Sequence, residues 1–200
     1  MSLKAKNKFL KSIEIIPPRY KIDNTLIKKI IQNQKYFDFL DIACCPMANL
    51  RISPLSFAHN LIIKGGDYKK IILNFSTRDK NTLALQSDIL GTYSMKVNKV
   101  LLIKGDPLKI GNSKKSKEVF EINTNEFIKI VGDLNKGKDY YGNKLKFRTD
   151  FITGSTINID NNLKILKSTI SKRMSIGSDF FITQPVYTDN DFEKLIKLSK

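Results

Sequence analysis

Short runs of apolar, β-branched and aromatic residues alternate along the chain with segments in which apolar residues recur at helical spacing. The short runs predict six strands, over 12–16, 37–45, 70–75, 97–103, 147–157 and 179–183. The helical spacing predicts a helix after each strand, over 26–34, 54–63, 79–93, 124–135, 161–174 and from about 190. This alternation indicates an α/β fold with right-handed crossovers and a parallel sheet.

Two parallel architectures are compatible with this order, a doubly wound open sheet and a (β/α)8 barrel. No G-x-G-x-x-G follows the first predicted strand, so the doubly wound dinucleotide fold lacks its signature. Polar residues instead follow the strands, which is where barrel enzymes place their active sites. These residues are Glu14, Asn74, Lys104, Gly105, Asp106, Asn158 and Gln184. Eight units need about 250 residues, so we expect an incomplete (β/α)8 TIM barrel of about six units. We expect it to form a single domain over 1–200 that is truncated at its C-terminus.

Composition narrows the class of protein. Hydrophobic residues make up 41% of the chain, which is ordinary for a globular protein. No apolar stretch approaches the roughly 20 residues of a membrane helix, and the basic start M-S-L-K-A-K-N-K-F-L lacks the apolar core of a signal peptide. We therefore expect a cytoplasmic protein that does not enter a membrane.

The two cysteines are adjacent, at Cys44 and Cys45. Neighbouring cysteines rarely form a disulfide, because the required geometry strains the peptide between them. With the single histidine they are too few for a zinc site. The simplest interpretation is two small buried strand residues, and a redox or metal role is the alternative.

The net charge of +16, from 35 basic and 19 acidic residues, favours polyanionic ligands. The excess is mostly lysine, spread from Lys4 to Lys200 without an aromatic-interleaved basic stripe. Solvated lysines explain most of it. A nucleic-acid-binding protein remains a remote alternative, and salt-sensitive binding to random strands would support it.

The segment S-I-E-I-I-P-P-R at 12–19 places a carboxylate inside an apolar run. With the period of two in a strand, Ile13 and Ile15 face one way and Glu14 faces the other. In a barrel, Glu14 then points inside, where desolvation would raise its pKa and suit a general acid. The alternative is a carboxylate paired with Arg19 or a lysine.

Three further segments follow predicted strands, and each has a purely structural interpretation as well. K-G-D-P at 104–107 is a turn signal whose glycine lets backbone approach a ligand. S-T-R-D-K-N at 76–81 is typical of the capped start of a helix. In F-F-I-T-Q-P-V-Y at 180–187, the glutamine amide offers a donor and an acceptor to a heterocycle or to loop backbone.

Five parts of the chain carry information together: E-I-I-P-P-R, S-T-R-D-K-N with A-L-Q-S-D-I-L-G, K-G-D-P-L-K-I-G, K-G-K-D-Y-Y-G and G-S-D-F-F-I-T-Q-P-V-Y. In this order they resemble the methylenetetrahydrofolate reductase family across nearly the whole chain. The R-D-K-N and T-Q-P-V-Y forms resemble most closely the reductase domains fused to homocysteine methyltransferases. The resemblance implies a flavin-dependent barrel enzyme of one-carbon metabolism and methionine biosynthesis. Such an enzyme binds FAD and passes a hydride from NADH or NADPH through flavin to 5,10-methylenetetrahydrofolate, giving 5-methyltetrahydrofolate.

The resemblance also assigns roles to residues. Glu14 matches the general acid that protonates the leaving folate nitrogen, and Asp106 matches an acid near the flavin pyrimidine edge. Gln184 matches a glutamine that binds the folate pterin or the nicotinamide amide. The remaining matches are to flavin contacts, namely Asn74, Lys104, Gly105, Phe120, Thr156, Asn158 and Arg173.

Two segments depart from the family pattern. Asn74 replaces a histidine expected to contact flavin, and A-C-C-P-M-A-N at 43–49 replaces a Thr-Tyr or Asp-Asn-Pro pattern that contacts the nicotinamide. The alternative is thus a family member without nicotinamide activity, either non-catalytic or supplied with electrons by a partner protein. A homo-oligomer, or a fused or partner methyltransferase, is the expected assembly.

Overall fold

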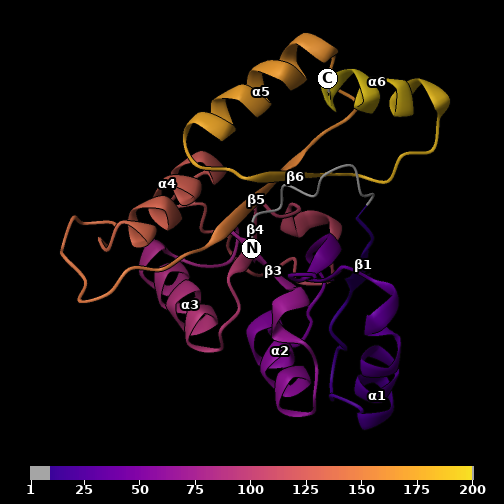
Figure 1. The fold of residues 1–200 in the computed structure, drawn as a ribbon, viewed down its shortest axis with the longest axis vertical. Coiled ribbons are helices and arrows are strands. Elements are labelled where there is room, and N and C mark those ends of the chain that lie inside the picture. The colour runs from indigo at the N-terminus through magenta and orange to yellow at the C-terminus, as the bar shows by residue number, and fades with distance from the viewer. Residues whose placement is uncertain (1–9, 200) are drawn as a thin grey trace.

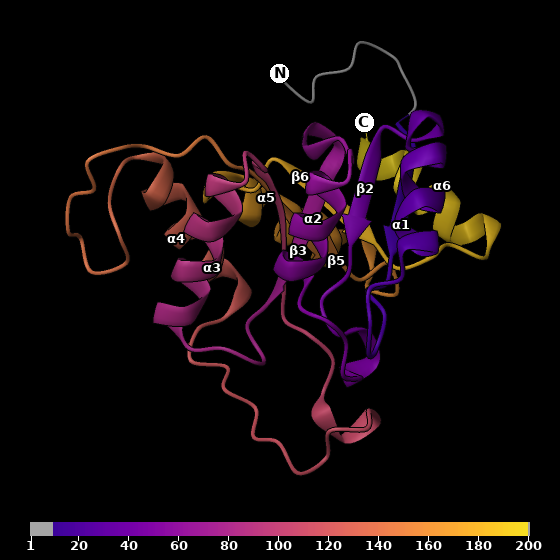
Figure 2. The same cartoon turned by 90° about the horizontal axis from the view of Figure 1, so that it is seen from below.

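Six parallel strands form a single curled sheet in the computed structural model, which describes residues 10–199 (Figure 1). The strands are β1 (Ser12–Ile15), β2 (Phe39–Ile42), β3 (Ile71–Ser76), β4 (Lys99–Ile103), β5 (Ile152–Ile157) and β6 (Phe180–Thr183). Each pairs with its sequence neighbours in the order β1 to β6. The expected incomplete (β/α)8 barrel is confirmed, because the helices alternate with the strands and cover the outer face (Figures 1 and 2).

A helix follows each strand, as the spacing predicts. The helices are α1 (Asn24–Asn33), α2 (Pro54–Ile63), α3 (Thr82–Ser94), α4 (Thr124–Asn135), α5 (Leu163–Ser175) and α6 (Asp189–Ser199). Side-chain caps set several starts: Asn81 accepts from the Ala84 N–H, and Asn123 forms a capping box with Glu126. The cap at Asn81 explains why α3 begins after the predicted position 79. Within residues 10–199, no helix has the length and apolar character needed to cross a bilayer.

The core lies between the sheet and the helices. The register aligns Ile15 with Ile42, Ile42 with Leu73, and Leu73 with Val100, so one face of four strands is continuously apolar. All four side chains are at most 7% exposed. Burial of each contributes about 1.5–3 kcal/mol relative to exposure, so this face holds the helices against the sheet.

The opposite, concave face of the sheet presents polar groups. Glu14 pairs in register with Asp41, and Asp41 with Ile72. Asn74, two residues beyond Ile72, lies on the same face because side chains alternate along a strand. Farther round the sheet, the ring of Phe180 packs against its register partner Gly154, where a Cβ would overlap the ring.

Two predicted strands are too long. The strand expected over 37–45 ends at Ile42, because Cys45 adopts a left-handed conformation with φ of 40° and Pro46 begins a short 3-10 turn, η2 (Pro46–Ala48). The expectation that both cysteines are buried strand residues is therefore wrong, since each is half-buried beyond the strand.

The strand expected over 147–157 begins only at Ile152. The preceding backbone is held by the end of α4 instead of by a neighbouring strand. Asn135 Oδ1 accepts from the Phe151 N–H at 2.9 Å and from the Thr149 hydroxyl at 2.7 Å. A side chain 14 to 16 residues away thus satisfies the groups that a strand would pair.

Candidate active site

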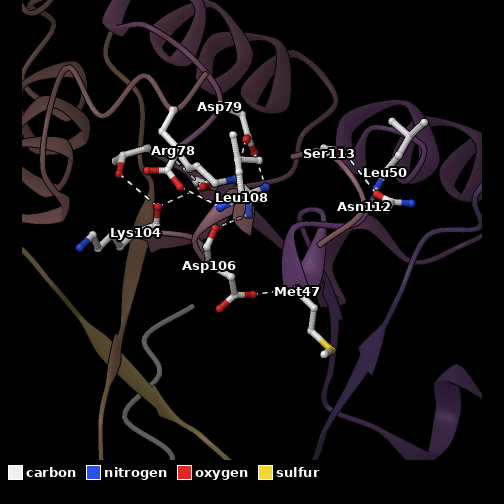
Figure 3. A network of polar contacts seen from close by, with 12 residues as sticks. Met47, Leu50, Arg78, Asp79, Lys104, Asp106, Leu108, Asn112 and Ser113 are labelled. Carbon is white, nitrogen blue, oxygen red and sulfur yellow. Dashed lines mark hydrogen bonds and ion pairs between the residues drawn. The ribbon is translucent and has the colours of Figure 1, made fainter. Parts of the chain in front are cut away.

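The loops after β2 and β4 lie on the same side of the sheet, beyond its carboxyl ends (Figure 2). The N–H of Met47 donates to Asp106 Oδ2 at 2.7 Å, and the N–H of Leu50 donates to Asn112 Oδ1 at 3.2 Å (Figure 3). A Cβ on Gly111 would overlap the backbone of Ala48, so the two loops approach with nothing between them. Asp106, expected near a flavin, therefore also anchors the β2 loop.

Arg78 is the buried centre of this network, with its side chain 2% exposed. Its Nε and Nη2 donate to the two carboxylate oxygens of Asp79 at 2.6 and 2.7 Å. Its Nη1 donates to the backbone carbonyl of Asp106 at 2.8 Å (Figure 3). A two-point Arg–carboxylate pair fixes orientation as well as charge, so Arg78 positions Asp106. Sequence reasoning gave Arg78 no role, although the adjacent Arg-Asp directly after β3 was a usable signal.

The predicted residues Lys104, Gly105 and Phe120 gather at the end of β4. The Lys104 carbonyl accepts from the hydroxyl of Ser76 at 3.1 Å. Gly105 has φ of +86°, and a Cβ there would overlap Ser76 Oγ, so only glycine suits this position. The Lys104 ammonium lies 5.5 Å from the centroid of the Phe120 ring, within cation–π range. An exposed cation and an aromatic ring therefore meet beside Asp106.

Three predicted flavin contacts have partners elsewhere in the chain. The Arg173 guanidinium donates to the Thr156 carbonyl and, at 3.3 Å, to Asn125 Oδ1, which joins α5 to β5 and α4. Burial lowers the pKa of Arg173. Asn158 Oδ1 accepts from the Asp160 N–H at 3.0 Å in an Asx turn. Among residues 10–199, the hydrogen bonds of Arg173 connect α5 to β5 and α4, that of Asn158 stays within the turn after β5, and none of them reaches Asp106.

Glu14 lies on β1, and Gln184 directly follows β6, so the two residues belong to the first and last strand positions of the curl. Both are exposed. The expectation that the barrel interior would desolvate Glu14 is therefore wrong for the described residues, because β1 has a strand on only one side. Gln184 follows β6, with its backbone carbonyl accepting from the Thr183 hydroxyl at 2.8 Å. Both side chains remain available to a ligand on the concave side.

The buried acid of this face is Asp41, which sequence reasoning missed. Asp41 is 8% exposed. Its burial, and secondly the charge of Glu14, raise its pKa to about 7 against an opposing hydrogen bond from the Asn74 amide. The alternation of side chains along a strand was the available signal. Asp41 is the register partner of Glu14, so both side chains belong to the same face of the sheet.

The cysteine pair contains one acidic thiol. The hydrogen bond from Cys44, together with the Arg51 N–H and the charge of Arg78, lowers the pKa of Cys45 to about 6 although burial opposes this. The same hydrogen bond and burial raise the pKa of Cys44. In the described part of the chain, no group of three or more His, Cys, Asp or Glu side chains could hold a metal ion. The redox alternative for this pair thus has a physical basis, in a half-buried thiolate at Cys45.

Cys45 should react with iodoacetamide as a thiolate at neutral pH. Since its pKa is lowered to about 6, the alkylation rate should rise about tenfold from pH 5 to pH 7 and stay level above pH 7, because only the thiolate attacks. Mass spectrometry of the quenched protein locates and quantifies the label. Cys45→Ser should abolish it, and Cys44→Ala should move the midpoint upward. A rate at Cys45 that keeps rising to about pH 8.5, as for a free thiol, would contradict the assignment.

One comparison with known proteins gives a match. A family model described as methylenetetrahydrofolate reductase matches residues 1–200. A search of curated proteins found no match.

Proposed function

Because the chain belongs to the methylenetetrahydrofolate reductase family, we propose that it reduces 5,10-methylenetetrahydrofolate to 5-methyltetrahydrofolate through FAD, with NADH or NADPH as hydride donor. Family membership supports a folate-related reductase of one-carbon metabolism. The observation that carries the finer proposal is the convergence of Lys104, Gly105, Asp106 and Phe120 at the carboxyl end of β4. Barrel enzymes place their chemistry at this end of the strands.

The residues present suit a flavin. Asn74 Oδ1 is buried and has no hydrogen-bond partner within residues 10–199, so a ring N–H of a bound heterocycle would satisfy it. The Lys104 ammonium, exposed beside the Phe120 ring, adds a local positive charge, and the net charge of +16 attracts the FAD phosphates. When bound, the flavin supplies the hydride chemistry, and the protein supplies orientation, a proton and electrostatics.

The proton is the contribution we assign to Glu14. Reduction at the methylene carbon requires that the folate nitrogen leaving that carbon be protonated. Glu14 presents an exposed carboxyl group on the concave face, where it can reach a ligand. The Met47 N–H donates to the Asp106 carboxylate and fixes its position. A negative charge there stabilises a cationic folate. Gln184 offers its amide to the pterin or to the nicotinamide.

Flavin content and two half-reactions test this proposal. The purified protein, supplied with FAD, should bind about one flavin per chain and lose its yellow absorbance under anaerobic NADH or NADPH. Methylenetetrahydrofolate should then restore the absorbance and yield 5-methyltetrahydrofolate by mass. A protein that stays colourless in excess FAD would refute the proposal.

A second candidate keeps the flavin and the folate but takes electrons from a partner protein. The observation favouring it is the β2 loop, where Cys45, with its lowered pKa, and the left-handed residues Met47 and Ala48 occupy the segment expected to contact the nicotinamide. The same titration distinguishes the two, because dithionite would then bleach the flavin while NADH and NADPH would not. A cytoplasmic location, and a homo-oligomer or a methyltransferase partner, complete the proposal.

A further inference from the structure

Two carboxylates of very different exposure lie side by side on the concave face. Glu14 and Asp41 are register partners in the adjacent parallel strands β1 and β2. Strands so paired lie about 4.8 Å apart and direct partner side chains to the same face. Glu14 is exposed, whereas Asp41 is 8% exposed. One carboxyl group can therefore meet a ligand while its neighbour is shielded from water.

Two buried acceptor atoms at Asp41 and Asn74 have no hydrogen-bond donor among the described residues. Asp41 Oδ1 and Asn74 Oδ1 are both buried, and neither has a partner within residues 10–199. The Asn74 amide N–H donates to the Asp41 carboxylate, which leaves the amide oxygen of Asn74 without a donor. A buried acceptor without a partner is costly. A carboxylic acid is itself a donor, so a proton on Asp41 removes the charge from this donor-poor site and turns one of its unpaired acceptor oxygens into a donor.

The charges around Asp41 act in the same direction. From β1 it faces Glu14, and from β3 it faces the apolar Ile72 and the neutral Asn74. Among the described residues, the charge that acts on Asp41 is that of Glu14, and no cation compensates it. Two neighbouring carboxylates resist ionising together. Burial and Glu14 raise the pKa of Asp41 to about 7, so the cluster binds a proton near neutrality.

We propose that Glu14 and Asp41 form a carboxyl pair that shares one proton, with Asp41 as the positioning residue that keeps this proton available to Glu14. When the shared proton lies on Glu14, Glu14 gives it to the substrate nitrogen, which leaves both carboxyl groups of the pair ionised. Solvent then returns one proton to the pair. No electrons move in these steps, and the charge of the pair changes by the one proton transferred. The catalytic half of this inference rests on the proposed function; the shared proton does not.

The shared proton is tested without any cofactor, by urea unfolding of the protein between pH 4 and pH 8. An acid whose pKa is higher in the folded than in the unfolded state stabilises the fold at low pH, and this stabilisation is lost as pH rises through the folded pKa. The urea midpoint should therefore fall as pH rises from about 4.5 to about 7.5 in the wild type. In Asp41→Asn this fall should be absent, and in Glu14→Gln it should move to lower pH. Asp133→Asn, an exposed aspartate, is the matched control and should keep the wild-type profile.

The positioning role is tested in the FAD-loaded enzyme by the pH profile of the folate half-reaction. The Asp41→Asn rate should match the wild type within about twofold at pH 5.5 and fall about tenfold below it at pH 7.5, since one pH unit in the midpoint of the pair is tenfold in protonated fraction. Flavin content and flavin reduction by the nicotinamide should be unchanged, which shows that the variant is folded.

Each outcome bears on one half of the inference. A wild-type urea profile in Asp41→Asn would overturn the shared proton. A wild-type folate profile in that variant would overturn the positioning role. If the protein binds no flavin, the proposed function and the positioning role fail together, while the urea profiles still support or overturn the shared proton.

Discussion

Glu14→Gln should leave the reduction of flavin by the nicotinamide at its wild-type rate and slow the folate half-reaction by about 10²- to 10⁴-fold, the usual contribution of a general acid. Glutamine keeps the shape of the side chain and removes its acidic proton. The first half-reaction moves a hydride between two cofactors and needs no proton from Glu14. The second requires a protonated folate nitrogen, so it should lose most of its rate. Anaerobic stopped-flow absorbance of the flavin measures each half-reaction separately.

The control for this variant is Glu193→Gln, which removes an exposed glutamate on α6. It should change neither half-reaction. Equal losses in both half-reactions of Glu14→Gln would contradict the acid role, because that result would indicate damage to flavin binding or to the fold.

Arg78→Leu should lower the free energy of unfolding by about 2–4 kcal/mol. Removing one member of a buried ion pair typically costs roughly 3–5 kcal/mol, because the other charge stays behind without a partner. Here the loss should be somewhat smaller, since the Asp79 side chain is 32% exposed and water can partly solvate it. The Asp106 carbonyl also loses the donor that holds it at 2.8 Å. Urea unfolding at pH 7, followed by circular dichroism, measures the effect.

The matched control is Arg19→Leu, because Arg19 is an exposed arginine on the loop after β1. Its effect should stay within about 0.5 kcal/mol. Arg78→Lys should recover only part of the stability, since an ammonium cannot reproduce the two-point contact with Asp79 and the bond to Asp106 together. A loss below about 1 kcal/mol in Arg78→Leu would show that the network does not hold the two loops.

The fold was largely predictable because its signals are local. An apolar run such as that over 97–103 indicates a strand buried on both sides. The pair Asn123 and Glu126 indicates the start of α4. The errors arose where distant groups replace local pairing. Asn135 holds the backbone before β5, and Asp106 holds the N–H of Met47 after β2. Neither contact follows from periodicity, because each joins segments far apart in the chain.

The candidate site was predictable in part. The rule that parallel strands present their active site at their carboxyl ends led to Lys104, Gly105 and Asp106, and these lie together with Phe120. The same rule led to Asn158, and the family resemblance led to Arg173; the hydrogen bonds of both are made elsewhere. Arg78 and Asp41 were missed, because a residue type and a strand face do not reveal what a side chain meets across the fold.

By itself, the sequence determined that this chain forms parallel β/α units, that it resembles one reductase family, and that an acid at Glu14 faces away from the helix-covered side. These properties follow from spacing along the chain, which local geometry translates directly into strands and helices. Only the tertiary structure decided which carboxyl group is buried. The register places Asp41 between Glu14 and Ile72, with Asn74 on the same face, while the edge position of β1 leaves Glu14 exposed. Burial depends on how strands lie beside one another, and that is a property of the packed sheet.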